Sequence, residues 1–171
     1  MRTSPDIAIV TVCLNDLAGL KRTYESIRAQ TRPPLQWIVA DGGSTDGTVE
    51  WLQTVEWAPL SQSSRADGGI YEGMNEGLRR VTAGFVLFLN SGDLLAGPTV
   101  LEEVESRLAE LAERPALLFG DSFEVDRWMR PNLRRARPAW WVWLGMPTTH
   151  QAMFFRRDAL PDGFDTRYRL S

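Results

Sequence analysis

A carboxylate and two glycines directly follow an apolar run of this sequence. Residues 41–48 read Asp-Gly-Gly-Ser-Thr-Asp-Gly-Thr, after the apolar run 35–40. The pattern predicts a strand that ends at an acidic residue, a tight turn, and a helix capped by one of residues 44–46. Open α/β sheets bind ligands at the carboxyl ends of parallel strands. Asp41 is therefore a candidate to accept a charge-assisted hydrogen bond from the imide N–H of uracil or thymine. The alternative is a turn whose polar residues only cap the helix.

A second polar turn, Asn-Ser-Gly-Asp at residues 90–93, follows the apolar run 85–89. A carboxylate on such a turn can coordinate a hard divalent cation. The cation would bridge the two phosphates of a nucleotide diphosphate and neutralise the charge that grows on the leaving group. We therefore predict that Asp93 binds a divalent metal, Mg²⁺ or Mn²⁺. A plain β-turn is the alternative.

The elements that must position these turns alternate between strand and helix. Apolar runs predict strands at residues 7–14, 35–40, 85–89, 116–119 and 151–155, with a short extended piece at 60–65. Helical spacing of apolar residues predicts helices from about residue 17, across 49–55 and 70–81, and from Gly97-Pro98 onward, because proline suits the first helical position. This alternation predicts an α/β fold with a mostly parallel central sheet and helices on both faces.

Size and composition fit a single domain over residues 1–171. The net charge of -3 argues against a general nucleic-acid binder, so no nucleic-acid partner is expected. Cys13 is the only cysteine, which excludes an intramolecular disulfide, and we expect it to be buried. No secretory signal is recognisable, and no apolar run approaches the roughly 20 residues that cross a bilayer. The expected location is cytoplasmic.

A basic, aromatic segment stands out late in the chain. Between residues 128 and 143 it holds Arg130, Arg134, Arg135, Arg137, Trp140, Trp141 and Trp143. We expect the tryptophans to pack over the sheet and the arginines to form a solvated loop. The alternative is a peripheral contact at the inner face of the plasma membrane, because arginines attract anionic lipid and indoles favour the interface.

Four segments, in order, make the chain resemble family-2 glycosyltransferases: residues 41–48, 64–75, 90–93 and 146–151. The resemblance implies a GT-A-type nucleotide-binding fold, with residues 1–95 as the nucleotide-sugar-binding half and 96–171 as an incomplete acceptor-side half. It also implies transfer of a sugar, with inversion, from a nucleotide diphosphate-sugar donor of the UDP type to a glycan or lipid-linked acceptor, in polysaccharide or glycolipid synthesis. The family usually carries two aspartates in its acidic motif, whereas here Gly92 fills the place beside Asp93.

The resemblance further implies which residues contact substrate. They are Thr11, Asn15, Asp41, Arg65, Asp67 and His150. Asp67 is expected to reach the base or ribose and Arg65 the pyrophosphate, although Arg65 could instead be a solvated arginine. His150, the only histidine, is expected to contact phosphate or acceptor, with a bond to a loop carbonyl as the alternative. Asp121 is a weaker candidate for acceptor binding, and Asn75 is expected to be a structural amide.

The resemblance places the catalytic base, an Asp or Glu, after a phrase like residues 164–170, about where this chain stops at Ser171. We therefore expect the chain as given to be truncated, to bind donor, and to transfer poorly. Within the chain, His150 and Asp165 are the weaker candidates for the base.

Two other classes of protein stay open. A sugar-nucleotide pyrophosphorylase would carry a glycine-rich, basic loop after the first strand, and residues 15–19 lack one. A non-catalytic nucleotide-binding module is favoured only if the base is missing from the natural protein.

Overall fold

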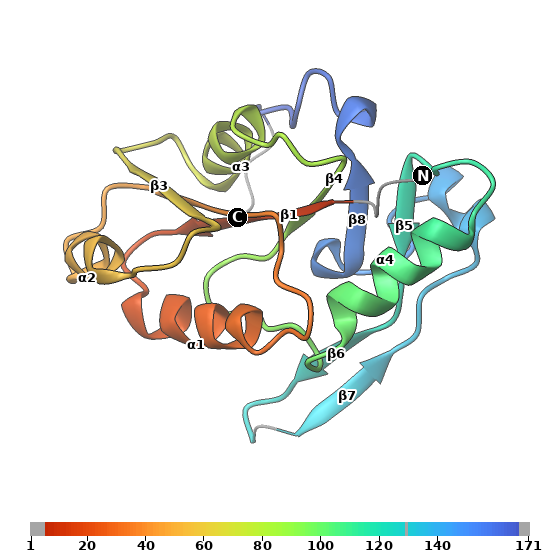
Figure 1. The fold of residues 1–171 in the computed structure, drawn as a ribbon, viewed down its shortest axis with the longest axis horizontal. Coiled ribbons are helices and arrows are strands. Elements are labelled where there is room, and N and C mark those ends of the chain that lie inside the picture. Colours follow the sequence, from red (N-terminus) through yellow and green to blue (C-terminus); the bar gives the residue numbers. More distant parts are fainter. Residues whose placement is uncertain (1–5, 129, 168–171) are drawn as a thin grey trace.

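A six-stranded sheet, in the order β3-β2-β1-β4-β8-β5, forms the centre of the computed structural model, which describes residues 6–128 and 130–167 (Figure 1). Its strands are β1 (Ile7–Cys13), β2 (Gln36–Asp41), β3 (Leu60–Ser64), β4 (Phe85–Phe88), β5 (Leu117–Phe119) and β8 (Met153–Arg156). The first four are parallel, and β8 runs antiparallel between β4 and β5. The carboxyl ends of β1 to β5 and the amino end of β8 therefore share one edge of the sheet.

Helices cover both faces of this sheet. Helices α1 (Leu17–Arg28), α2 (Thr48–Thr54) and α4 (Val100–Glu110) lie on one face, and α3 (Ile70–Arg79) lies on the other (Figure 1). The expected α/β fold, with a mostly parallel sheet and helices on both faces, is confirmed. The expected helix start at Pro98 was wrong, because α4 begins after Thr99, whose carbonyl accepts the first helical bond from Glu103 N at 2.9 Å.

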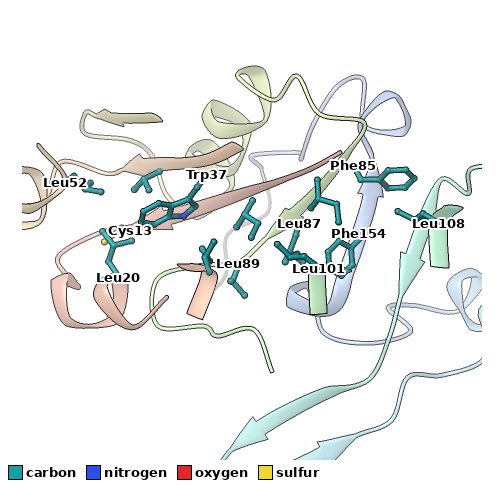
Figure 2. Packing of buried hydrophobic residues seen from close by; sticks show 14 residues of the cluster. Cys13, Leu20, Trp37, Leu52, Phe85, Leu87, Leu89, Leu101, Leu108 and Phe154 are labelled. Atoms are coloured by element: carbon teal, nitrogen blue, oxygen red, sulfur yellow. The ribbon is translucent and has the colours of Figure 1, made fainter. Parts of the chain in front are cut away.

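The larger part of the core lies under α1, α2 and α4. Alternate residues of β1, β2 and β4 meet the helices there, and Trp37 and Phe85 are among the fully buried side chains (Figure 2). The indole Nε1 of Trp37 donates to the Thr11 hydroxyl at 3.0 Å. That bond satisfies a polar atom that would otherwise be costly to bury. Cys13 is buried in the same cluster, as expected.

On the opposite face, α3 approaches β1 very closely through two glycines. A Cβ placed on Gly77 would lie 2.3 Å from Val10 Cγ1, and one on Gly73 would lie 2.8 Å from Val12 Cγ1. Only residues without side chains fit at these two positions. The close packing fixes the position of the loop before α3, which carries Asp67.

Residues 122–146 connect β5 to β8 and are called the arm below; residue 129 lies outside the described residues. The arm contains the antiparallel pair β6 (Ser122–Val125) and β7 (Pro131–Arg134), which extends beyond the central sheet (Figure 1), and a 3₁₀ helix at Ala139–Trp143. The expectation that the tryptophans pack over the sheet was wrong for Trp140 and Trp143, which are 59% and 90% exposed. Trp141 is half-buried.

No helix within residues 6–128 and 130–167 combines the length and apolarity needed to cross a membrane.

Candidate functional site

The loops at the carboxyl edge of the sheet bring together polar residues that are far apart in the sequence. Strand β1 is in register with β2 so that Cys13 lies beside Asp41, and β2 with β3 so that Asp41 lies beside Ser64. The turn after β4 joins the same edge, since Ser91 N donates to Val12 O at 3.0 Å. The site is built from these loops and from the segment that precedes β8.

Asp41 is the centre of the turn between β2 and α2. The residue is 2% exposed, and its carboxylate accepts hydrogen bonds from Gly43 N at 3.1 Å, Ser44 N at 2.9 Å and Ser64 Oγ at 2.6 Å. The Ser44 hydroxyl donates to its other oxygen. Gly43 has a φ of +91°, and a Cβ placed on it would lie 3.1 Å from Ala66 N in the loop after β3. The Asp41 carboxylate therefore holds two loops together and is turned inward.

The loop after β1 is attached to the same turn. Asn15, which has a φ of 50°, receives a bond from Thr45 N on its Oδ1 at 2.8 Å, and its own N donates to Ser44 Oγ at 2.7 Å. Asp46 accepts from Leu17 N at 2.9 Å and from Thr48 N at 3.1 Å. Bonds from the Thr48 hydroxyl and these backbone groups lower the pKa of Asp46. Asp46 thus supplies the expected helix cap, although Gly47 is the residue at the boundary.

Asp67 and Arg65 lie on the loop between β3 and α3. The Asp67 carboxylate is half-buried beside Gly42 and Gly73, and its Oδ1 accepts from Gly69 N at 3.0 Å. Arg65 is 58% exposed and forms an ion pair of 3.4 Å with Glu76. Asp67 is therefore the carboxylate that stands next to the glycine turn, while Arg65 remains at the surface.

The turn at residues 90–93 meets the segment before β8. Gln151 Nε2 donates to Asp93 Oδ2 at 3.0 Å, and Asn90 Nδ2 lies 3.2 Å from His150 Nε2. Thr23 of α1 binds the backbone of this turn, since its hydroxyl donates to Asp93 O at 2.9 Å and accepts from Gly92 N at 3.0 Å. One carboxylate, one imidazole and two amides therefore converge at this point.

Burial lowers the pKa of His150, and the nearby Asp93 carboxylate partly offsets this by raising it. Because the lowering is the larger effect, His150 is mainly a neutral imidazole at pH 7. Asn90 Oδ1 is buried beside it without a hydrogen-bond partner among the described residues.

No group of three or more His, Cys, Asp and Glu side chains that could hold a metal occurs within the described residues. Asp93 is the one carboxylate of the 90–93 turn. One of its oxygens accepts from Gln151, and among residues 6–128 and 130–167 the other has no hydrogen-bond donor. Mg²⁺ is often held by only one or two carboxylates together with substrate phosphates. The Asp93 carboxylate fits that mode of binding and does not fit a site made of protein ligands alone.

Other residues expected at the site lie differently. Thr11 is fully buried within β1 and bonded to Trp37, so it does not face the loops. Asp121 Oδ1 accepts from Ala136 N at 2.8 Å and so ties the base of the arm. Asp165 is paired with Arg167, which lowers its pKa.

Asn75 is a structural amide, as expected. It exchanges two bonds with the backbone of Phe164, from Nδ2 to O at 2.8 Å and from N to Oδ1 at 2.7 Å. The end of the phrase that was expected to precede the base, residues 168–170, lies outside the described residues, as does Ser171.

Sequence reasoning missed the roles of Ser64, Thr23 and Gln151. Thr23 is a single hydroxyl outside any motif, and Ser64 begins the segment 64–75 without any local signal that its hydroxyl binds Asp41. Gln151 was expected to begin the strand 151–155, but it lies in the 3₁₀ turn His150–Ala152 that precedes β8, where its side chain can reach Asp93.

Comparison with known proteins identifies relatives over nearly the whole chain. The family model of glycosyl transferase family 2 matches residues 8–166. An uncharacterized glycosyltransferase of Mycobacterium tuberculosis is 37% identical over 110 residues, which are 64% of this chain and 42% of that protein. A PGL/p-HBAD biosynthesis glycosyltransferase of Mycobacterium bovis is 28% identical over 98% of this chain and 66% of its own length. The chain thus spans less than half of the first of these relatives.

Solved structures share the fold. TarS 1-349 of S. aureus, in complex with UDP-GlcNAc, matches with a TM-score of 0.72 and 18% identity over 92% of this chain and 47% of that chain. The mannosyltransferase PcManGT of Pyrobaculum calidifontis, in complex with GDP-Man and Mn²⁺, matches with a TM-score of 0.66 and 20% identity over 96% of this chain and 49% of that chain. The expected GT-A-type fold is confirmed by these neighbours.

Proposed function

The chain belongs to glycosyl transferase family 2, and on this premise we propose that it takes part in moving a sugar, with inversion, from a nucleotide diphosphate-sugar donor to an acceptor hydroxyl. The acceptor class is a glycan or a lipid-linked sugar, in polysaccharide or glycolipid synthesis. One observation supports the proposal most strongly. The loops that carry Asp41, Asp67 and Asp93 lie together with His150 at one edge of the mostly parallel sheet. Such an edge is where open α/β sheets bind ligands.

We propose a division of labour between the first two carboxylates. The oxygens of Asp41 accept hydrogen bonds from backbone N–H groups and serine hydroxyls, so the role of this carboxylate is to stabilise the turn. Asp67 stands beside Gly42, where a nucleoside can approach the backbone closely. Asp67 is therefore proposed to contact the base or ribose of a uridine-type donor, and Asn15 and the exposed Arg65 to border the diphosphate. Thr11 is left out of the binding set.

The metal proposal rests on Asp93. When bound, Mg²⁺ or Mn²⁺ would supply charge neutralisation on the diphosphate leaving group. PcManGT, which shares the fold, was solved with GDP-Man and Mn²⁺. In this chain, Gln151 orients the Asp93 carboxylate through a 3.0 Å bond, and Thr23 fixes the backbone on which it stands. These bonds hold the carboxylate in place before any ligand arrives, which reduces the ordering cost of binding.

His150 is proposed to contact a phosphate oxygen or the acceptor. An uncharged imidazole can donate a hydrogen bond there without adding charge. Asp165 is occupied by Arg167. We therefore assign the base that an inverting transfer requires to neither His150 nor Asp165.

Calorimetric titration with UDP, with and without Mn²⁺, tests the proposal. Asp93→Ala should abolish the part of the affinity that depends on the metal, while the exposed Asp162→Asn serves as a control with the same loss of charge. Unchanged, metal-dependent binding in Asp93→Ala would reject the metal assignment.

Product analysis with a matched donor and acceptor tests the reaction itself. A glycosylated acceptor and free nucleoside diphosphate are expected. Release of a nucleoside triphosphate from donor and pyrophosphate would instead identify a pyrophosphorylase, and binding without any product would identify a nucleotide-binding module.

A further inference from the structure

The arm exposes large apolar side chains on the short segment around its 3₁₀ helix. Trp140 and Trp143 are exposed, as are Leu144, which is 69% exposed, and Met146, which is 60% exposed. Trp141 is half-buried against the neighbouring Trp140 ring, with centroids 5.5 Å apart. Scattered exposed apolar residues are ordinary, but four of this size within seven residues form a patch that indicates an interaction surface.

The arm also carries a charge opposite to that of the rest of the chain. Residues 122–146 hold five arginines and two acidic residues, a formal charge of +3, whereas the remaining residues hold fourteen basic and twenty acidic residues, a charge of -6. The two acids of the arm are both neutralised, Glu124 by Arg134 and Asp126 by Arg130. The excess positive charge therefore belongs to three other arginines.

Those three arginines are Arg127, Arg135 and Arg137. Within residues 6–128 and 130–167, no ion pair is recorded for any of them. Arg127 lies over the ring of Trp128 and Arg137 over that of Trp141, at 5.1 and 5.0 Å from the centroids. Guanidinium groups held against indoles thus stand in the same arm as the apolar patch.

Both ends of the arm are attached at the edge of the sheet that carries the proposed site. The Asp121 carboxylate, just after β5, binds Ala136 N, and Arg137 N donates to Pro147 O at 2.7 Å. His150 follows three residues after Pro147. A surface bound by the arm would therefore lie beside the candidate site.

We propose that the arm docks on an anionic phospholipid surface. The tryptophans and Leu144 enter the headgroup level, where indole rings are favoured, and Arg127, Arg135 and Arg137 meet lipid phosphates. A lipid surface needs no shape complementarity to an arm that extends beyond the central sheet (Figure 1). A stable protein partner would instead need a complementary interface of about 800 Å² on each side. The inference goes beyond the proposed glycosyl transfer, since docking requires neither donor nor acceptor.

Flotation with large unilamellar vesicles tests the docking in the absence of nucleotide. The chain is expected to bind vesicles of phosphatidylcholine with 30% phosphatidylglycerol and to float weakly or not at all with phosphatidylcholine alone. Trp140→Ser with Trp143→Ser should weaken binding by roughly 100-fold, about tenfold for each buried aromatic group. Arg135→Gln with Arg137→Gln should weaken it by roughly 20-fold and flatten its salt dependence.

Two control variants have matched changes elsewhere. Leu35→Ser removes an exposed apolar side chain, and Arg79→Gln with Arg107→Gln removes two exposed arginines; both should bind as the parent chain does. Circular dichroism confirms that each variant is folded.

Absence of flotation with the anionic vesicles, or equal loss in the control variants, would overturn the proposal. Sedimentation velocity tests the alternative that the arm binds a second copy of this chain. If the parent chain is a dimer that the tryptophan variant converts to a monomer, and neither binds vesicles, then the arm joins two copies and the lipid proposal is rejected. The flotation and sedimentation experiments contain no nucleotide-sugar donor. The docking proposal can therefore fail while the proposed transferase function stands, and the transferase function can fail while the docking proposal stands.

Discussion

Replacing Asp41 should damage the stability of the fold before it damages any single ligand contact. The buried carboxylate accepts two backbone N–H groups and two serine hydroxyls that come from both sides of the site. Asp41→Ala removes all of these acceptors at once. The hydroxyls can turn toward water, but the N–H groups of Gly43 and Ser44 lose their partner inside a tight turn.

The magnitude follows from those bonds. Hydrogen bonds to a charged group contribute about 1.5–3 kcal/mol each, and an unsatisfied buried group costs about 1–3 kcal/mol. Counting the two N–H groups fully and the hydroxyls in part, we expect Asp41→Ala to lower the free energy of unfolding by about 3–5 kcal/mol. For a chain of this size that corresponds to a Tm lower by roughly 10 °C. Asp41→Asn keeps one acceptor oxygen for the N–H groups but loses the charge and replaces the oxygen that accepts from the Ser44 hydroxyl with an NH₂ donor, so about 1–2 kcal/mol is expected.

Urea unfolding followed by circular dichroism measures all three chains, with Asp67→Asn as the control. Asp67 is half-buried and accepts a single recorded bond, from Gly69 N, so its neutral variant should stay within about 1 kcal/mol of the parent. If Asp41→Ala unfolds like the parent chain but no longer binds uridine nucleotides, the structural reading of this carboxylate is refuted. The direct contact to the base expected from the sequence would then be the better account.

Three further perturbations test particular contacts. Gln151→Leu removes the bond to Asp93 and should weaken metal-dependent UDP binding about tenfold by calorimetry while leaving metal-free binding unchanged; an equal effect on both would contradict the orienting role. Asn75→Ala removes both bonds to the Phe164 backbone and should destabilise the chain by about 1–3 kcal/mol in urea unfolding, so a change below about 0.5 kcal/mol would refute it. Gly77→Ala places a methyl group against β1 and should cost about 1–3 kcal/mol, measured as a lower Tm, and a neutral effect would show that α3 can move away.

The fold could be predicted from the sequence because its signals are local. Residues 37–40 and 85–88 are continuous apolar runs, and residues 7–13 are apolar except for Thr11; short runs of this kind, bounded by turn residues, are typical of strands buried on both faces. Helical periodicity between them requires crossovers, and crossovers require parallel strands. The placement of Asp41 and Asp93 at the sheet edge follows from the same reasoning, since Asp41 directly follows one such run and Asp93 belongs to the four-residue turn that follows another.

The partners of those residues were decided only by the tertiary structure. Gln151 is 58 positions from Asp93, and Ser64 is 23 positions from Asp41; each pair meets because the strand order places the two loops side by side. The direction of a side chain was equally undetermined, so Thr11 was expected at the site although its position in β1 turns it into the core.

The exposure of the arm was likewise decided by the tertiary structure. The sequence contains a basic, tryptophan-rich segment there, but a tryptophan is equally suited to a core and to an interface. Trp37 is fully buried and Trp143 is 90% exposed. Local pattern determines which elements form, because backbone hydrogen bonding and apolar periodicity act over a few residues. Burial and long-range partners depend on which elements pack together, and that is a property of the whole chain.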